Sequence, residues 1–109
     1  MARKVAWLTA AWEDLESVAE YVAKDSPVYA AAIVREARDA ARSLSRFPMR
    51  GRVVPELSRK DVRELIVGSY RMIYRVGAGE SLILAFIHGA RDVGEITREQ
   101  SWRRGRNLN

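Results

Sequence analysis

The chain has 109 residues, of which 48% are hydrophobic, and this combination is typical of one ordered globular domain. It contains no cysteine, which excludes disulfides and thiolate metal sites. No run approaches the ~20 apolar residues that a membrane-spanning helix needs. We therefore expect a cytoplasmic protein without a membrane segment, and we expect no cofactor and no metal.

The net charge of +5 is unevenly distributed. Residues 1–25 hold three cations against five carboxylates, so the excess of positive charge lies in the rest of the chain. Most of the cations are arginines, whose planar guanidinium pairs bidentately with carboxylate or phosphate. The charge indicates an acidic partner, either nucleic acid or an acidic protein segment, or else a basic surface that only keeps the protein soluble.

The first half of the chain predicts a short strand and two helices. The apolar run Lys4–Leu8 predicts the strand, and Thr9 can cap the helix that follows. Ser26-Pro27 predicts the start of a second helix, since serine is a good N-cap and proline suits the first helical position. Phe47-Pro48 ends that helix, and the short connection between the helices predicts an antiparallel hairpin. Apolar stripes at three- and four-residue spacing support both helices: Trp12, Leu15, Val18, Ala19 and Val22, then Ala30, Ile33, Val34, Ala37, Ala41 and Leu44.

The second half predicts three antiparallel strands. Val62–Val76 forms two of them around Gly68-Ser69, where glycine supplies the positive φ of a type II′ turn. Gly77–Glu80 makes a looser turn into a third strand, Ser81–Arg91. Pro55 keeps any strand before them short or at an edge. The fold class is therefore α+β, with a helical hairpin packed on one face of an antiparallel sheet and the other face open.

Side chains alternate across a strand, so the turn at Gly68-Ser69 assigns residues to faces. The more apolar face, expected under the helices, carries Leu65, Val67, Tyr70, Met72 and Tyr74, with Arg63 at its margin. The opposite face carries Val62, Glu64, Ile66, Arg71, Ile73 and Arg75, and there Glu64 can reach Arg71 or Arg75 diagonally.

His88, the single histidine, has no fixed face from sequence alone. If Val76 pairs with Ser81, His88 shares the Arg71 face, whereas a loop longer by one residue moves it to the Tyr70 face. A lone histidine on an apolar strand is more often a structural group than a catalyst, although imidazole titrates near neutrality. The chain shows no Ser-His-Asp spacing, no phosphate loop and no paired-carboxylate signature.

A series of short motifs runs along the chain: Leu15…Tyr21-Val-Ala, Pro27, Leu44…Phe47-Pro48…Gly51-Arg52…Pro55-Glu56, Val62-Arg-Glu-Leu, Tyr70-Arg-Met-Ile-Tyr74 and Ile87-His-Gly-Ala-Arg91. In this order the motifs resemble the RelE/ParE toxins of bacterial type II toxin–antitoxin modules. The resemblance covers about residues 3–92, and it implies a toxin domain over residues 1–94 followed by a polar, basic tail over residues 95–109. The fold of that family is a helical hairpin on an antiparallel sheet, with the first strand typically beside the last.

The resemblance implies one of two activities. RelE-like members cleave mRNA on the ribosome with basic residues on the sheet and often a late tyrosine, whereas ParE-like members inhibit DNA gyrase. His88-Gly-Ala-Arg91-Asp92 is the ParE-like form, no tyrosine follows Tyr74, and Arg50 and Arg52 stand where RelE-like members have a lysine-rich stretch. The resemblance therefore favours a gyrase inhibitor that is not an enzyme. The alternatives are an mRNA endoribonuclease and a partner-binding module without activity.

As an endoribonuclease, the chain would use His88 as acid or base, with Glu64 as a substitute, and Arg63, Arg71 and Arg91 as cations for the phosphorane charge. Every alternative implies a cognate ParD-like antitoxin and a hetero-oligomer with it, and the gyrase inhibitor requires no direct binding of nucleic acid. Arg35, Arg38, Arg42 and Arg46 form a basic stripe that either docks the antitoxin or only solvates its helix. The candidates for contact with target or antitoxin are Arg71, Arg75, Arg91, Arg50, Arg52, Trp102, Arg103 and Arg104.

Overall fold

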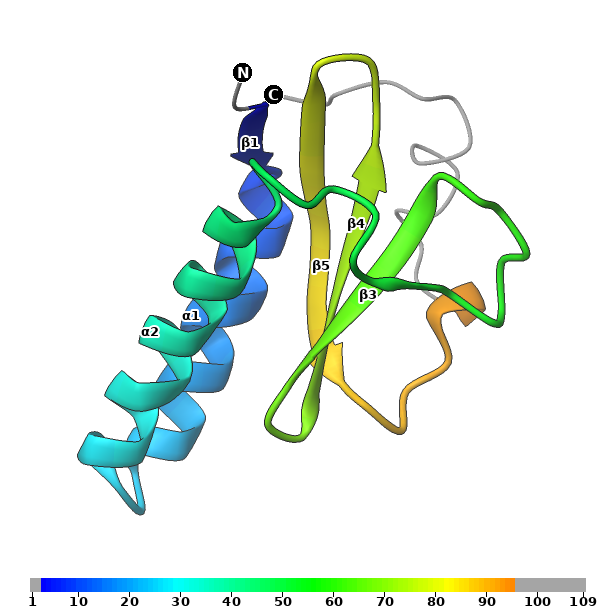
Figure 1. Cartoon of the computed structure of the whole chain (residues 1–109). Coiled ribbons are helices and arrows are strands. Elements are labelled where there is room, and N and C mark those ends of the chain that lie inside the picture. Colours follow the sequence, from blue (N-terminus) through cyan, green and yellow to red (C-terminus); the bar gives the residue numbers. More distant parts are fainter. Residues whose placement is uncertain (1–2, 96–109) are drawn as a thin grey trace.

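A computed structural model describes residues 3–95 and gives a two-layer α+β fold, in which a helical hairpin covers one face of a five-stranded sheet (Figure 1). The strand order is β1-β5-β4-β3-β2, so β5 lies inside the sheet between β1 and β4. This arrangement confirms the predicted fold class. The elements are β1 (Lys4–Trp7), α1 (Thr9–Ala23), α2 (Pro27–Ser43), β2 (Arg52–Val53), β3 (Val62–Val67), β4 (Tyr70–Val76), β5 (Glu80–His88) and the 3-10 turn η1 (Val93–Glu95).

The helix boundaries follow their capping residues. The hydroxyl of Ser26 accepts a hydrogen bond from the amide of Tyr29 at 3.1 Å, and Pro27 occupies the first position of α2, as predicted. The prediction that Thr9 caps α1 is wrong, because the N-cap is Leu8 and Thr9 is already helical. The second helix also ends before Phe47-Pro48, with Leu44 as its C-cap.

The sheet has the predicted hairpins. Gly68 has a φ of +60°, and Ser58 is the one non-glycine residue with a positive φ in the described chain, so Ser69 keeps the negative φ of a type II′ turn. This turn sets Val67 opposite Tyr70. The first strand, β1, lies parallel to β5, so it is beside the last strand, as the resemblance implies.

An irregularity in β5 decides the face of His88. Val76 pairs with Ser81, and that pairing was expected to place His88 beside Arg71. The register slips by one residue between Ile73 and Tyr74, because Tyr74 pairs with Ile83 while Ile73 pairs with Ala85. The extra residue, Leu84, is a β-bulge that turns the remainder of β5 over. His88 consequently pairs with Tyr70 and shares its face. The prediction that a Val76–Ser81 pair would place His88 on the Arg71 face is therefore wrong.

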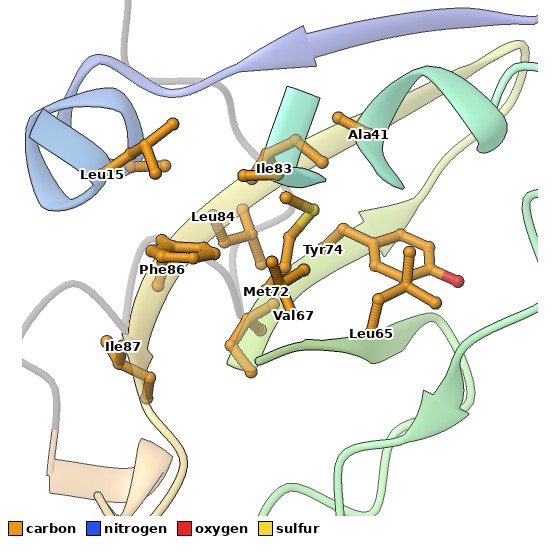
Figure 2. Packing of buried hydrophobic residues seen from close by; sticks show 14 of the residues in the cluster. Leu15, Ala41, Leu65, Val67, Met72, Tyr74, Ile83, Leu84, Phe86 and Ile87 are labelled. Carbon is orange, nitrogen blue, oxygen red and sulfur yellow. The ribbon is translucent and has the colours of Figure 1, made fainter. Parts of the chain in front are cut away.

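The core lies between the hairpin and the sheet (Figure 2). Leu15 of α1 and Ala41 of α2 face Met72, Tyr74 and Phe86, all of them fully buried or nearly so. Leu65 and Val67 belong to the same cluster, which confirms the face predicted to lie under the helices. Alanines at 30, 37 and 41 keep α2 close to its neighbours, since they add little side-chain bulk.

The second face of the sheet was expected to be open, and this expectation is wrong. Val62, Glu64 and Ile73 on that face are at most 1% exposed. The covering residues include Val54 and Val93, which belong to the same buried cluster. A two-layer sheet of this size would otherwise leave apolar side chains in water, so the connections before β3 and after β5 complete the core.

Within residues 3–95, no helix is long and apolar enough to cross a membrane. The predicted boundary between a toxin domain over residues 1–94 and a tail over residues 95–109 stays a prediction, because residues 96–109 lie outside the described chain.

Candidate functional site

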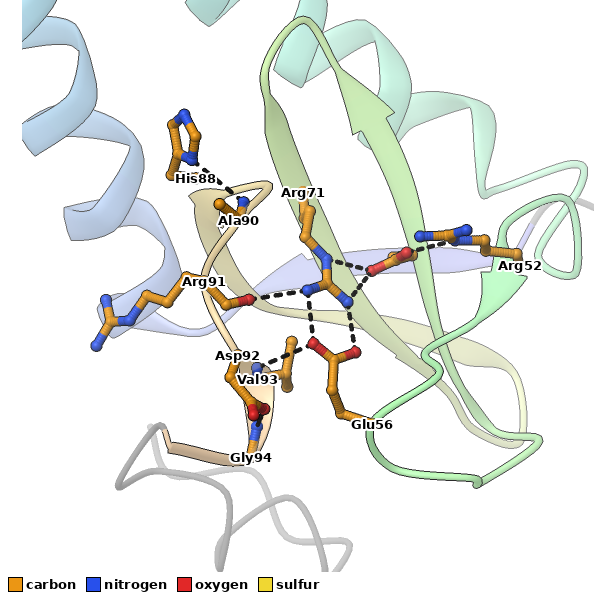
Figure 3. A network of polar contacts seen from close by, with 10 residues as sticks. Arg52, Glu56, Arg71, His88, Ala90, Arg91, Asp92, Val93 and Gly94 are labelled. Carbon is orange, nitrogen blue, oxygen red and sulfur yellow. Dashed lines mark hydrogen bonds and ion pairs between the residues drawn. The ribbon is translucent and has the colours of Figure 1, made fainter.

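A buried arginine organises the outer face of the sheet (Figure 3). The guanidinium of Arg71 donates two hydrogen bonds to the carboxylate of Glu56, both at 2.8 Å, and one from Nε to Oε1 of Glu64 at 2.6 Å. It also donates to the backbone oxygen of Arg91 at 2.9 Å. The side chain of Arg71 is 6% exposed, so its charge is compensated inside the protein. We call these residues, together with Arg52, the Arg71 network.

Two carboxylates hold the Arg71 network together. Glu64 has a side chain with no exposed surface and accepts from both Arg71 and Arg52. The hydrogen bonds from Arg71 lower the pKa of Glu56 from 4.5 to about 2, against the opposing effect of burial. The same contact with Glu56 raises the pKa of Arg71, so both partners stay ionised.

The Arg71 network also fixes the chain after β5. Oε2 of Glu56 accepts the amide of Val93 at 3.3 Å, while Arg71 holds the carbonyl of Arg91. Glu56 thus joins the connection before β3 to the segment after β5, and both lie over the sheet. The sequence analysis named Pro55-Glu56 only as part of a motif; a carboxylate 15 residues from Arg71 gives no local signal of this contact.

On the other face, His88 stands at the rim of a cleft between α1 and the ends of β4 and β5. Its ring makes an edge contact with Tyr70, with centroids 5.8 Å apart, and its Nδ1 accepts the amide of Ala90 at 3.2 Å. Tyr70 in turn stacks on Phe86. The cleft has a volume of about 370 Å³ and is lined by Asp14, Ser17, Val18, Tyr21, Tyr70, Phe86, Ile87, His88 and Arg91.

The α1 side of this cleft is tied to the bulged strand. Oδ2 of Asp14 accepts the amide of Phe86 at 3.0 Å. The strand β1 ends at Trp7, opposite Ile83, so it does not reach Phe86. A helix carboxylate therefore satisfies a strand amide that the sheet leaves unpaired, which fixes the cleft's floor relative to α1.

Comparison with known proteins identifies the family. The profile of the family described as "ParE toxin of type II toxin-antitoxin system, parDE" matches residues 5–93, most of the chain. The chain belongs to the ParE toxin family. A relative named Toxin RelE2, from Caulobacter vibrioides, is 34% identical to this toxin over 89 residues, covering 81% of this chain and 97% of the relative.

Two solved structures share the fold of this ParE-family toxin. One is described as a chromosomal ParDE toxin–antitoxin system from P. aeruginosa; it has a TM-score of 0.65 at 22% identity, and the match covers 80% of this chain and 96% of that one. The other is the RelBE2 toxin–antitoxin complex from Mycobacterium tuberculosis. It has a TM-score of 0.53 at 28% identity, over 81% of this chain and 99% of that one.

The structure separates the residues that an endoribonuclease would need. In this toxin Arg71 lies in its network on one face of the sheet, while His88 and the side chain of Arg91 line the cleft on the other (Figure 3). Glu64, the possible substitute base, is buried between Arg71 and Arg52. Tyr74 is also fully buried, and burial raises the pKa of its hydroxyl.

The remaining candidate cations of the toxin lie in different surroundings. Arg63 donates to the carbonyl oxygens of Lys60 and Gly51 at 3.1 and 2.8 Å, and Arg50 donates to the hydroxyl of Ser43 at 2.6 Å. Arg75 is half-buried beside Asp61, whose pKa is lowered mainly by Arg59 and to a smaller extent by Arg75. Trp102, Arg103 and Arg104 lie outside the described residues. Across residues 3–95, no three His, Asp or Glu side chains are placed to hold a metal.

Proposed function

We propose that this toxin inhibits DNA gyrase in the cytoplasm without cleaving RNA, and that a cognate ParD-like antitoxin neutralises it. The position of Arg71 carries the proposal. A cation that stabilises a phosphorane must face the substrate, yet Arg71 is saturated by Glu56, Glu64 and a backbone carbonyl. The histidine that would supply acid–base chemistry stands on the opposite face. The family description, which names ParE, supports the same proposal.

The second candidate is a RelE-like endoribonuclease. The relative named Toxin RelE2 supports it, at 34% identity over most of both chains. An RNase of this kind would need a different set of groups, drawn from the cleft that contains His88, Arg91 and Tyr70. These side chains offer an acid or base, a cation and a hydroxyl within one cleft, although no second histidine accompanies them.

The antitoxin is expected to add a strand to the free edge of β3. The two-residue strand β2 pairs with Arg63 and Glu64 only. The edge from Leu65 to Val67 has no pairing strand in the described chain, and Ile66 within it is 61% exposed. An open strand edge next to an apolar side chain suits an extended segment of a partner protein. Arg50, which is exposed just before β2 and has no carboxylate partner among residues 3–95, suits an acidic segment.

A two-armed assay tests the proposed activity. Purified toxin is added to gyrase with relaxed plasmid and, in parallel, to translating ribosomes with mRNA. We expect supercoiling to be lost, or cleaved DNA to be trapped, while the mRNA stays intact. The variant His88→Gln is expected to keep full inhibition, because gyrase inhibition requires no acid–base step from His88.

Cut mRNA with unaffected supercoiling would instead establish the endoribonuclease, and His88→Gln should then abolish cleavage. Arg91→Ala tests the exposed cation of the cleft, with Lys24→Ala as its matched control, since Lys24 is also exposed and lies in the short connection between α1 and α2. Equal activity of both variants would exclude Arg91 from the target contact.

A further inference from the structure

An exposed aromatic platform follows α2 and is built from Phe47, Pro48 and Met49. Phe47 is 62% exposed and Met49 is 52% exposed, although both are large apolar side chains. With Ser43 and Arg50 they line a hollow of about 580 Å³. This size is in the range of ligand-binding pockets, and the one charged side chain in its lining is Arg50.

The platform is held rigidly from below. The hydroxyl of Tyr74 donates to the carbonyl of Pro48 at 2.7 Å and accepts the amide of Gly51 at 3.0 Å. A Cβ on Gly51 would lie 2.5 Å from the backbone oxygen of Glu64, so glycine alone allows the loop to approach the sheet this closely. The exposed ring of Phe47 therefore sits on a preorganised loop, which reduces the entropy that a ligand must remove on binding.

A series of arginines leads along α2 to the platform, and we call it the basic band: Arg35, Arg38, Arg42, Arg46, Arg50 and Arg63. Arg35, Arg38 and Arg42 recur every three or four residues on α2, which spaces them about 5 Å apart along the helix axis. Arg63 reaches the platform from β3, since its Nη1 contacts the carbonyl oxygens of Met49 and Gly51. The band thus runs along α2 and past the platform.

The charge of the basic band is almost uncompensated. Among residues 3–95, the structure pairs one band member with a carboxylate, Arg42 with Asp39 at 3.3 Å, and both side chains are largely exposed. Arg50 and Arg63 donate to a hydroxyl and to carbonyl oxygens, which carry no charge. The buried arginine of the sheet differs, because two carboxylates neutralise it. The band therefore keeps its positive charge for an external anion.

We propose that the basic band and its platform bind single-stranded DNA, with the band following the phosphates and a base stacking on Phe47. Rows of cations beside an exposed aromatic ring are the combination that holds single strands without sequence preference. A duplex hides the faces of its bases, so the platform favours a single strand. The choice of DNA rests on the proposed function, because gyrase acts on DNA; the binding itself requires no gyrase.

Fluorescence anisotropy of the full-length toxin with a labelled 20-nucleotide DNA strand tests the proposal in the absence of gyrase. We expect Phe47→Ala to weaken binding about tenfold without changing the salt dependence, since stacking is insensitive to salt. Arg46→Ala should lower the slope of log K against log salt by about 0.7, the value for one lost phosphate contact in a single strand. Circular dichroism checks that each variant is folded.

Matched controls lie at the far end of the hairpin, where Tyr21 is 71% exposed and Lys24 is exposed. Tyr21→Ala removes an aromatic ring and Lys24→Ala a cation, and neither should change the affinity by more than about twofold. If the control variants bind DNA as weakly as Phe47→Ala and Arg46→Ala, the proposal is overturned, because binding would then depend on net charge alone. Equal affinity for duplex DNA would overturn it too, as would a tenfold preference for RNA or for an acidic peptide.

Failure of this test leaves the proposed function standing, since gyrase inhibition through protein contacts needs no DNA site. Conversely, DNA binding with the expected pattern and no effect on supercoiling would support the site and contradict the proposed function. The two outcomes are therefore separable.

Discussion

At the scale of single residues, Arg71 shows that one guanidinium can use its hydrogen-bond donors for contacts within the fold. Two carboxylates and a carbonyl take its donors, so it joins β4, the connection before β3 and the segment after β5. The alternation of side chains along the strands placed Arg71 on a face with Glu64 and predicted that Glu64 could reach it, which the structure confirms. It could not foresee Glu56, because that contact closes a long loop.

Replacing Arg71 should therefore affect stability before it affects any target. Arg71→Ala leaves Glu64 buried without its main partner, and breaking a buried ion pair costs about 3–5 kcal/mol. Urea unfolding followed by circular dichroism should show this loss. The control Arg59→Ala removes a more exposed pair with Asp61 and should cost at most about 1 kcal/mol. A stable Arg71→Ala protein that has lost its activity would assign Arg71 to a functional contact instead.

Glu56 predicts an acid-sensitive fold. Its pKa in the folded state is about 2, below its usual 4.5, so the unfolded chain binds the proton more readily. The stability that this carboxylate contributes is complete above pH 4.5 and is lost as the pH falls toward 2. Glu56 is partly exposed and water screens its charge, so Glu56→Gln should remove about 1–2 kcal/mol at pH 7 and flatten the stability curve between pH 5 and 2. If the curves of stability against pH run parallel for the wild-type and Glu56→Gln proteins, this role of Glu56 is contradicted.

At the scale of elements, the signals of local geometry were reliable. Ser26-Pro27 and Gly68-Ser69 each impose a backbone conformation on their own neighbours, and α2 and the β3–β4 hairpin begin and turn where they indicate. The bulge at Leu84 could not be predicted, because its sequence is as apolar as the strand around it. The burial of the second face of the sheet could not be predicted either, since the loops that cover this face lack periodicity.

The free edge of β3 gives a prediction for the partner. Ile66→Lys places a charge on an exposed position beside the unpaired edge, which discourages strand addition without disturbing the core. Antitoxin binding, measured by calorimetry, should weaken at least tenfold while the melting temperature stays within a few degrees. Val28→Lys is the matched control, because Val28 is also exposed, at 82%, but lies on α2. Equal losses in both variants would place the antitoxin elsewhere.

At the scale of the whole molecule, β5 is the centre of the fold. It pairs with β1 and β4, and its residues from Ser81 to Ile87 are all buried. Backbone amides in the middle of such a strand open only when the whole domain unfolds. Hydrogen exchange should therefore be slowest in β4 and β5, and faster in the two-residue β2 and in the turn at Gly77–Gly79. Fast exchange in β5 would show that the sheet opens without global unfolding.

Charge is also organised at this scale. Excess acid lies in the first 25 residues, whereas the basic band follows α2 and the loop after it. Because the buried arginine is neutralised by two carboxylates while most arginines of the basic band have no carboxylate partner, the net charge of +5 reports mainly on the surface. Composition alone predicted an acidic partner, but it could not separate the two populations of arginine, since that separation needs the carboxylates of the fold.

The bulge in β5 also has an evolutionary consequence. Leu84 is the one residue that sets His88 on the side of α1, and every side chain after it on the strand follows the same inversion. Loss of the Leu84 codon would remove the bulge and leave His88 opposite Tyr70, whereas a relative that keeps every residue but pairs them regularly would bring its imidazole to the side of Arg71. Two lineages of equal length, one with the bulge and one without it, would share nearly all of their sequence while displaying different chemical groups on each surface. An alignment without a gap would therefore equate histidines that face opposite directions.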